Sequence, residues 1–531
     1  MIVNEMRIIM QNNGVKKIIM HGGILAVAGI LVRIIGLVYR IPMLNIIGDE
    51  AYGIYSAAYN VYNIMLVLSS YGLPMAVSKL VSDRMVKKQY KDAKKIFKSS
   101  LIVATCTGGL AASITFFGAE FIEKNFYSGY HGIALPLKVL APTIFIVSML
   151  GVLRGFYQGM GTTIPTAMSQ LIEQIVNAIV SIVAGYVLIK SFSDSAKVNG
   201  YGAAGGTMGT AFGALAALVL LVFIFVMYRP VLNRKAKKDI YSTDERYFEI
   251  FKVIIMTMIP IILGQTFYQI SAMIDDIMYG KIMLDIGVTS EEITRAIGNY
   301  NSSYVILTGV VMGVASAMST SMLPSIVASK AQYKYEEISE KISATIKTNM
   351  MIAIPSFVGL VILGRPIVQL LFAKYDSIEG GMMLRIGGIA VIFYTISTVT
   401  SSALQGIDKM KLPVIHSSIS LAIHIVLVFV LLKFTNLGIY AIVIGSTTFP
   451  VVVMILNLVA LNRYVGYTQE IIQTFLIPSI CAFIMGIFVV LTYNFLIMIT
   501  NSNFVALIFA MIIAAISYFG PIYLCKKKGL Y

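Results

Sequence analysis

The stretch ILAVAGILVRIIGLVYRIPM, from Ile24 to Met43, is long and apolar enough to cross a lipid bilayer, yet it contains Arg33 and Arg40. A helix that crosses the hydrocarbon core needs about 20 mainly apolar residues, which this stretch supplies. A cation at the bilayer centre costs roughly 2.5–3.5 kcal/mol, so both arginines need an anionic partner or a water-filled cavity. The stretch therefore predicts a membrane-spanning helix that also has a polar function.

The composition extends this prediction to the whole chain. Of its 531 residues, 58% are hydrophobic and 12% are charged, whereas soluble domains carry about 25% charged residues. We therefore expect an all-α, multi-pass membrane protein. The same length criterion predicts 14 membrane-spanning helices. Their expected centres are Gly29, Met65, Leu110, Phe145, Val176, Gly213, Gly264, Gly309, Ser356, Phe393, Ile423, Val452, Ile484 and Ile513.

The lysines and arginines are distributed unevenly between the predicted loops. With the N-terminus in the cytoplasm, the inner loops and tails hold 27 of the 41 basic residues, the outer loops hold 8 and the spans hold 6. Cytoplasmic loops are enriched in Lys and Arg, so this bias predicts that both termini are cytoplasmic. The basic runs flank spans and contain no nucleic-acid recognition module. The net charge of +16 therefore indicates contact with anionic lipid headgroups and no nucleic-acid partner.

The chain also contains a weak internal duplication, with offsets of 250 and 247 residues for two pairs of motifs and of 236 residues for a third. Three pairs of motifs repeat: LPMAVSK (Leu73–Lys79) with LPSIVASK (Leu323–Lys330), Gln158-Gly159 with Gln405-Gly406, and Gly209-Thr210 with Gly445-Ser446. A repeated unit with an even number of helices keeps its topology, so the copies are related by an axis along the membrane normal. The sequence thus predicts an N-terminal lobe at 1–240 and a C-terminal lobe at 241–465. Two further helices are expected at 466–531.

Basic residues outnumber acidic ones inside the predicted spans. The six cations are Arg33, Arg40, Lys79, Lys138, Arg154 and Arg385, and the three comparably deep acids are Glu173, Asp275 and Asp276. Charges inside a membrane protein need a partner or a wet cavity. The excess of positive charge therefore predicts that an anion passes through this protein, and the chain is expected to be a transporter.

Several of these motifs resemble the polysaccharide-transporter branch of the multidrug/oligosaccharidyl-lipid/polysaccharide flippase superfamily, the branch of the lipid II flippases and the sporulation protein B-like proteins. The similar stretches are VRIIGLVYRIP (Val32–Pro42), IIGDEAYGIYSAAY (Ile46–Tyr59), SSYGLPMAVSKLVSD (Ser69–Asp83), RGFYQGMGTTIPTAMSQLIEQIVN (Arg154–Asn177) and ALQGIDKMKLP (Ala403–Pro413). The resemblance implies two six-helix lobes in a V around a cationic cavity. It also implies alternating access, which moves a lipid-linked saccharide pyrophosphate from the inner to the outer leaflet. The last two helices would form a groove for the lipid tail.

The resemblance assigns Arg33 to the cationic cavity, and Arg40 lies one residue beyond the family's next arginine. Arg33 and Arg40 differ by seven positions and so share a helix face. Arginine donates two parallel, charge-assisted hydrogen bonds, which suits a pyrophosphate. We expect the substrate-binding set to comprise Arg33, Arg40, Arg154, Lys79 and Arg295. The alternative is that these side chains bond carbonyls or extend to lipid headgroups at the helix ends.

Acidic and imidazole side chains suggest a coupling site. Glu173 is expected either to neutralise Arg154 or Arg33 or to carry a proton. Asp275 and Asp276 are candidates for coupling to Na⁺ or H⁺, because the resemblance implies a cation site in the second lobe; otherwise they face water at the outer interface. His424 and His416 are expected to pack or form hydrogen bonds. We predict no other cofactor and no structural metal.

Two other functions remain open. One is a cation-coupled multidrug exporter on the same fold, which would have an acidic cavity. The other is a scaffold without transport activity that binds cell-wall synthesis proteins. An enzyme is not expected, because no phosphate-binding glycine loop, zinc motif or Ser-His-Asp order occurs.

Overall fold

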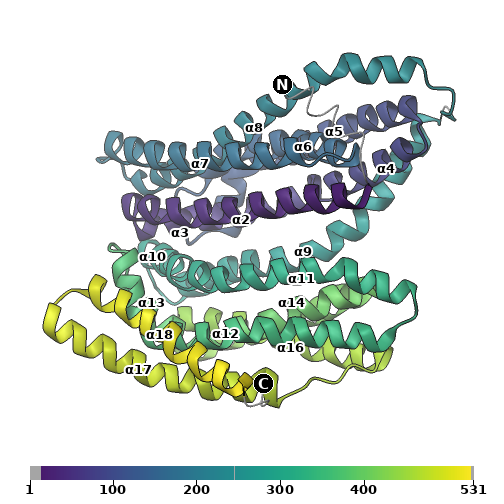
Figure 1. Cartoon of the computed structure of the whole chain (residues 1–531). Coiled ribbons are helices and arrows are strands. Elements are labelled where there is room, and N and C mark those ends of the chain that lie inside the picture. The colour runs from purple at the N-terminus through teal and green to yellow at the C-terminus, as the bar shows by residue number, and fades with distance from the viewer. Residues whose placement is uncertain (1–13, 244, 528–531) are drawn as a thin grey trace. The chain divides into compact units, whose positions relative to one another are not determined.

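The computed structural model describes residues 14–243 and 245–527, and within them the chain is helical with no β-strand (Figure 1). It divides into two compact units. Unit 1 comprises Met1–Ile47 and Ile54–Met273, and unit 2 comprises Gly48–Gly53 and Ile274–Tyr531. The division falls inside two helices, α3 and α9. The predicted lobe boundaries after residues 240 and 465 lie instead in the loops that follow α8 and α16, and they stay a prediction.

The helices of each unit follow one another along the chain with short connections. Unit 1 contains α2 (Gly14–Ile47), most of α3 (Asp49–Ser69), α4 (Leu73–Val86), α5 (Tyr90–Phe126), α6 (Ala134–Gly159), α7 (Ile164–Ser191), α8 (Val198–Lys237) and the larger part of α9 (Tyr247–Asp285). Unit 2 contains the end of α9, α10 (Ser290–Asn299), η1 (Tyr300–Ile306), α11 (Leu307–Ala331), α12 (Tyr335–Leu371), α13 (Ser377–Gly387), α14 (Ala390–Gly406), α15 (Lys411–Phe434), α16 (Ile439–Val465), η2 (Ile472–Leu476), α17 (Ile477–Thr500) and α18 (Asn503–Lys527).

The helix lengths confirm an all-α membrane protein. Within the described residues, 11 helices are long and apolar enough to cross a membrane, or up to 12 if the pair α13–α14, bent by 50°, counts as one span. Two further predicted spans, near Gly29 and Gly264, coincide with α2 and α9, whose side chains are described only in part. The number 14, the V arrangement and the cytoplasmic termini stay predictions.

Local sequence explains where several helices begin and end. Thr289 caps α10 in a capping box with Glu292, which satisfies two free backbone N–H groups. Asp376 caps α13 by accepting hydrogen bonds from the N–H groups of Ile378 and Glu379. At the other end of a helix, Gly466 follows α16 with a φ of 66°, a left-handed conformation that glycine adopts without steric cost.

Both units contain the same close contact at the repeated Gln-Gly motif. A Cβ on Gly159 of α6 would lie 2.7 Å from Val81 of α4, and a Cβ on Gly406 of α14 would lie 2.7 Å from Ile326 of α11. Only a glycine lets the two helix backbones approach this closely in a membrane bundle. The motifs that repeat in the sequence therefore make equivalent helix contacts in the two units.

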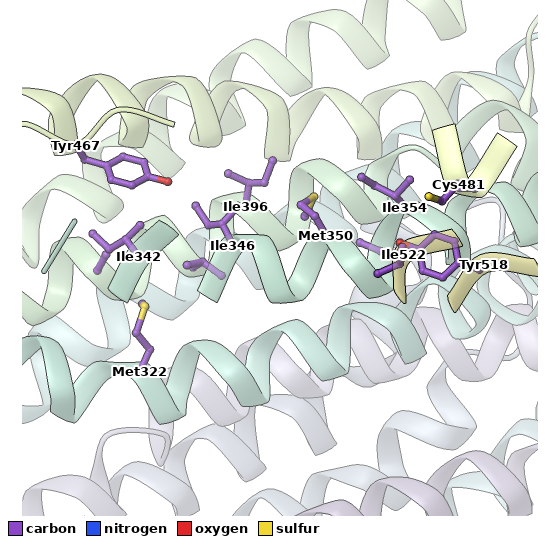
Figure 2. Packing of buried hydrophobic residues seen from close by; sticks show 14 of the residues in the cluster. Met322, Ile342, Ile346, Met350, Ile354, Ile396, Tyr467, Cys481, Tyr518 and Ile522 are labelled. Atoms are coloured by element: carbon purple, nitrogen blue, oxygen red, sulfur yellow. The ribbon is translucent and has the colours of Figure 1, made fainter. Parts of the chain in front are cut away.

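Each unit has its own apolar core. In unit 1 the core is formed mainly by α4, α5, α6 and α8. In unit 2 it extends from Met322 and Ile342 past Ile354 to Cys481 and Tyr518, so it includes α17 and α18 (Figure 2). The last two helices therefore pack on the second unit through buried side chains.

Candidate functional site

In unit 1, Arg154 forms a buried ion pair. Its Nη2 donates to Glu173 Oε2 at 2.5 Å, and its Nε donates to Ser169 Oγ at 3.0 Å. Only 17% of the Arg154 side chain and 26% of the Glu173 side chain are exposed. This is one of the two roles predicted for Glu173. Because a guanidinium has five N–H donors, Arg154 keeps donors available for a further anion.

Glu173 belongs to a line of polar side chains along α7. Ser169, Glu173, Asn177 and Ser181 recur every four residues and so share one helix face. Asn177 Nδ2 donates to the Tyr39 hydroxyl of α2 at 3.3 Å, and the Ser181 hydroxyl lies 2.9 Å from Asn177 Oδ1. The ion pair and these hydrogen bonds thus lie on one polar face of α7 inside the helix bundle.

Arg40 reaches the same polar region from α2. It directly follows Tyr39, whose hydroxyl accepts the hydrogen bond from Asn177 of α7. Nearby on α3, the Tyr59 hydroxyl hydrogen-bonds to Thr210 of α8 at 3.0 Å. The structure thus pairs two of the predicted site residues, Arg154 and Glu173, and a third, Arg40, is next in the chain to a residue that contacts the same face of α7. Arg33 lies two turns before Arg40 on α2, and its side chain is exposed.

In unit 2, a carboxylate and an imidazole form a buried pair. His424 Nε2 of α15 lies 2.7 Å from Asp275 Oδ1 of α9. Asp275, Asp276 and His424 are all at least 90% buried, so the predicted alternative in which the aspartates face water is wrong. His424 Nδ1 lies beside the Gly445 backbone without reaching hydrogen-bond geometry.

Tyrosines complete this buried site. The Tyr304 hydroxyl lies 3.0 Å from Ser446 Oγ of α16, the residue that follows Gly445, whose would-be Cβ contacts His424. Tyr300 and Tyr304 stack with their ring centroids 5.4 Å apart, and both lie in the π-helical turn η1. Such turns occur frequently at functional sites because they widen the helix and re-aim its side chains.

The two polar sites occupy matching places in the duplicated architecture. A Cβ on Gly209 would contact Asn177 and Ser181, whereas a Cβ on Gly445 would contact His424 and Val428. These contacts align Asn177 with His424. Their respective partners, Tyr39 and Asp275, are then equivalent as well.

The hydroxyl pair Tyr59–Thr210 in unit 1 likewise matches Tyr304–Ser446 in unit 2. The charge of the next residue differs between the units, because Arg40 follows Tyr39 and Asp276 follows Asp275. The polar site of unit 1 therefore includes a basic residue at this position, and the polar site of unit 2 includes an acidic one.

The other predicted cations are placed differently. Arg295 forms ion pairs with Asp49 and Glu50 inside unit 2, with about half of its side chain exposed. Lys79 is exposed on α4. Lys138 pairs with Glu120 at 2.7 Å, and Arg385 is exposed. In the described structure none of these four is part of the Arg154–Glu173 network.

An apolar pocket of about 680 Å³ lies in unit 2 against α17. Its described lining is almost entirely hydrophobic and includes Phe357 and Ile362 of α12, Ile392 of α14, and Phe483 and Ile487 of α17. Gly486 lies at its wall, where a Cβ would be 3.0 Å from Ile362 Cδ1. A pocket of this kind suits an alkyl or isoprenoid chain, since only apolar contact is offered.

Sequence reasoning did not identify His424 as the partner of Asp275, nor the Tyr39–Asn177 pair. The two members of each pair are more than 130 residues apart. The only available signal was the duplication itself, because Gly209-Thr210 and Gly445-Ser446 mark the helices against which Asn177 and His424 pack.

Comparison with known proteins assigns the family. The family model described as "Polysaccharide biosynthesis protein" matches residues 19–330, which is more than half of the chain. The chain belongs to the polysaccharide biosynthesis protein family. A second family model, MatE, matches residues 260–430 of this polysaccharide biosynthesis family protein.

Curated relatives of this polysaccharide biosynthesis family protein align along most of its length. It is 25% identical over 509 residues to "Lipid II flippase MurJ" of Bacillus subtilis (strain 168), with 93% of this chain and 91% of the relative covered. It is 22% identical to "Stage V sporulation protein B" of the same organism, with 87% of each chain covered. These relatives confirm the predicted superfamily and branch.

Solved structures agree on the fold. A structure titled "Lipid II flippase MurJ, inward closed conformation" aligns with a TM-score of 0.69 and 17% identity, covering 96% of this chain and 99% of that one. An inward-facing multidrug resistance MATE family transporter aligns with a TM-score of 0.63 and 18% identity, covering 81% and 98%. This polysaccharide biosynthesis family protein is a multi-pass membrane flippase or transporter of the cytoplasmic membrane.

Proposed function

We propose that the protein moves a polyprenyl-pyrophosphate-linked saccharide, lipid II or a related cell-wall or polysaccharide precursor, from the inner to the outer leaflet by alternating access. The observation that carries this proposal is the Arg154–Glu173 pair on the polar face of α7, with Arg40 next in the chain to Tyr39, which contacts Asn177 on that same face. The printed function of the Bacillus subtilis relative, a lipid II flippase, supports the same substrate class.

The charge arrangement fits a substrate that carries more than one negative charge. Glu173 neutralises one positive charge of Arg154, and the five N–H donors of this guanidinium leave some available for an incoming diphosphate. Arg33 lies two turns away on α2 and is exposed, where it can meet the headgroup first. Displacement of Glu173 by the diphosphate would exchange one anionic partner for another, so Arg154 need not be desolvated without a partner.

The lipid tail requires a separate, apolar surface. The pocket lined by α12, α14 and α17 offers such a surface, and its volume of about 680 Å³ admits part of an isoprenoid chain. We assign the tail to this pocket, so that α17 contributes the lipid-binding function expected for residues 466–531.

The acidic copy of the motif in unit 2 is assigned to coupling. Asp275 and Asp276 are buried, and Asp275 pairs with His424. Little water can stabilise the negative charge of these carboxylates, so a cation that binds there would neutralise it. The proposed coupling ion is Na⁺ or H⁺. Transport into vesicles with a Na⁺ gradient, compared with a pH gradient, distinguishes the two ions. The assignment is wrong if Asp275→Asn leaves the dependence on both gradients unchanged.

A depletion strain tests the function. Cells that lack their flippase accumulate the lipid-linked precursor, which mass spectrometry identifies, and the wild-type chain should restore growth and clear the precursor. Arg154→Gln should express in the membrane and fail to complement. Lys138→Gln is the matched control, because it also breaks a single cation–carboxylate pair but lies outside the network. Complementation by Arg154→Gln would contradict the proposed site.

A second candidate function is cation-coupled export of drugs. It is favoured by the MatE match at residues 260–430, a range that includes Asp275, Asp276 and His424. Drug-susceptibility profiling of a deletion strain separates the two functions: an exporter lowers drug susceptibility without altering precursor levels, and a flippase does the reverse.

A further inference from the structure

A lysine-rich pocket lies at one end of unit 1, away from the Arg154–Glu173 network. It has a volume of about 560 Å³ and is lined by the first turns of α5, the last turns of α8 and Tyr247 at the start of α9. Five of its described lining residues are lysines: Lys91, Lys94, Lys95, Lys98 and Lys237. The four on α5 follow the spacing i, i+3, i+4 and i+7, so they share one helix face.

The positive charge of this pocket is mostly uncompensated. Lys94 Nζ donates to Asn233 Oδ1 at 2.7 Å, which is a neutral acceptor. Asp92 is the one carboxylate among the described lining residues, and its Oδ2 accepts hydrogen bonds from the Thr243 backbone and hydroxyl. Within the described ranges, no carboxylate forms an ion pair with Lys91, Lys94, Lys98 or Lys237. The pocket therefore suits an anionic ligand.

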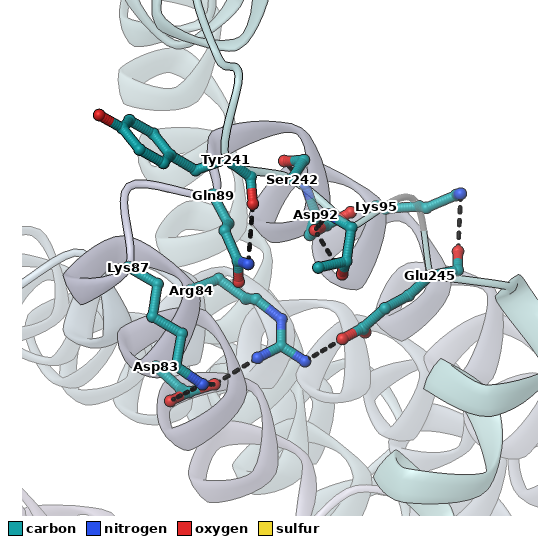
Figure 3. Close-up of polar contacts among 10 residues, drawn as sticks. Asp83, Arg84, Lys87, Gln89, Asp92, Lys95, Tyr241, Ser242 and Glu245 are labelled. Carbon is teal, nitrogen blue, oxygen red and sulfur yellow. Dashed lines mark hydrogen bonds and ion pairs between the residues drawn. The ribbon is translucent and has the colours of Figure 1, made fainter.

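Lys95 and its neighbours give the pocket a fixed wall. Figure 3 shows Lys95 donating to the Glu245 carbonyl, at 2.7 Å, beside the Gln89–Tyr241 and Arg84–Glu245 contacts that hold the segment before α9. The Lys95 ammonium also lies 4.9 Å from the centre of the Tyr247 ring. These contacts connect the α4–α5 corner to the start of α9, so the lysines are presented on a preformed surface.

The position of the pocket along α5 and α8 indicates where the anion comes from. The apolar part of α5 begins at Leu101, and its exposed side chains Ile102 and Phe116 continue the face that carries Lys91 and Lys98. On α8, the exposed side chains Val219, Val222 and Val226 lie on the same helix face as Asn233 and Lys237. The lysines thus lie where exposed apolar surface ends, which is the depth of phosphate headgroups.

We propose that this pocket binds the headgroup phosphate of an anionic membrane phospholipid, whose acyl chains lie along the exposed apolar faces of α5 and α8. The site is separate from the transport network and holds a resident lipid. Four lysines near one phosphate provide several charge-assisted hydrogen bonds, and a zwitterionic lipid would bring its own cation into the same pocket. The protein should therefore prefer phosphatidylglycerol to phosphatidylcholine.

Native mass spectrometry of the purified full chain tests the proposal, with phosphatidylglycerol and phosphatidylcholine of equal chain length as probes. The variant Lys91→Gln/Lys94→Gln/Lys98→Gln/Lys237→Gln should bind phosphatidylglycerol at least about tenfold more weakly. The control variant Lys252→Gln/Lys281→Gln/Lys409→Gln/Lys411→Gln loses the same charge at exposed lysines elsewhere and should bind like the wild type.

Two further measurements separate the alternatives. Arginine at the same four pocket positions keeps the charge, so this variant should retain lipid binding even if the glutamine variant unfolds. Inorganic phosphate should not displace the lipid, because it lacks the acyl chains. Equal loss in the pocket and control variants, equal binding of both lipids, or displacement by millimolar phosphate would each overturn the proposal.

Discussion

His424 Nε2 lies 2.7 Å from Asp275 Oδ1 in the interior of unit 2, at the place where unit 1 has the weaker pair Asn177–Tyr39, with a separation of 3.3 Å. The two copies of the bundle thus share the same helix contacts but have different side-chain pairs at this place. The pair in unit 2 joins an imidazole to a carboxyl group, whereas the pair in unit 1 joins an amide to a phenol hydroxyl. This difference makes the second unit the place to look for ion coupling.

The first prediction concerns this pair. Asp275→Ala or His424→Ala should each lower the midpoint of thermal unfolding, because the remaining partner is left buried without its hydrogen bond, at a cost of about 1–3 kcal/mol. The double variant should be less destabilised than the sum of the two single variants. Tyr39→Phe, which removes only the 3.3 Å contact in unit 1, should have a smaller effect. Strict additivity in the cycle would mean that the pair is not coupled.

The second prediction separates charge from position at Arg154. The exchange Arg154→Glu/Glu173→Arg should restore more of the thermal stability than either single change, because the ion pair is remade. It should not restore transport, since the guanidinium would then lie on α7 instead of α6. Unfolding midpoints and precursor flipping in vesicles report the two properties independently. Full transport by the exchanged variant would show that only the net charge matters.

The third prediction concerns the apolar pocket. Gly486→Leu should fill part of it, because a Cβ there already lies 3.0 Å from Ile362 Cδ1. Transport of a long-chain polyprenyl substrate should fall several-fold, with little change for a short-chain analogue that does not reach the pocket. Gly520→Leu on α18 is the matched control, since no atom lies within 4 Å of its would-be Cβ. A similar loss with both chain lengths would place the tail elsewhere.

The fourth prediction uses pH at the segment between α8 and α9. Burial disfavours the charge of Asp239, but hydrogen bonds from the Ser242 hydroxyl and from the N–H groups of Lys91 and Tyr241 outweigh burial, so its pKa lies below the usual aspartate value. The ionised carboxylate therefore holds the segment fully at pH values above about 4, the ordinary aspartate pKa. These hydrogen bonds are weakened as the pH falls through the lowered pKa that Asp239 has in the folded protein.

Limited proteolysis measures this effect. Cleavage within residues 239–243 should be slow at neutral pH and should accelerate only below about pH 4. Asp239→Asn should be cleaved faster at neutral pH, because its amide accepts fewer hydrogen bonds than the carboxylate. An acid-tolerant protease at matched activity is needed across the range. A variant with the same cleavage profile as the wild type would show that these hydrogen bonds do not hold the segment.

The membrane character was readable from the sequence, because hydrocarbon thickness imposes helix length and apolarity on each span separately. The superfamily was readable from the motifs that resemble it. The Gln-Gly and Gly-Thr/Gly-Ser repeats predicted the duplication, and in the structure Gly159 and Gly406 make equivalent contacts. Among the predicted cavity cations, the sequence could not tell Arg154, which pairs inside the bundle, from Arg295, which pairs with Asp49 and Glu50. Both are single basic residues near the end of an apolar segment.

Local sequence thus determined that the chain forms apolar helices with rare charges, because every span must satisfy its own backbone hydrogen bonds in lipid. The tertiary structure decided which charges meet. Arg154 faces Glu173 from the neighbouring helix, and Asp275 faces His424 from a helix nearly 150 residues away in the chain. Helix rotation and packing set these pairs through close contacts at glycines such as Gly213 and Gly445. Contacts of this kind depend on two helices at once, so they cannot be read from either helix alone.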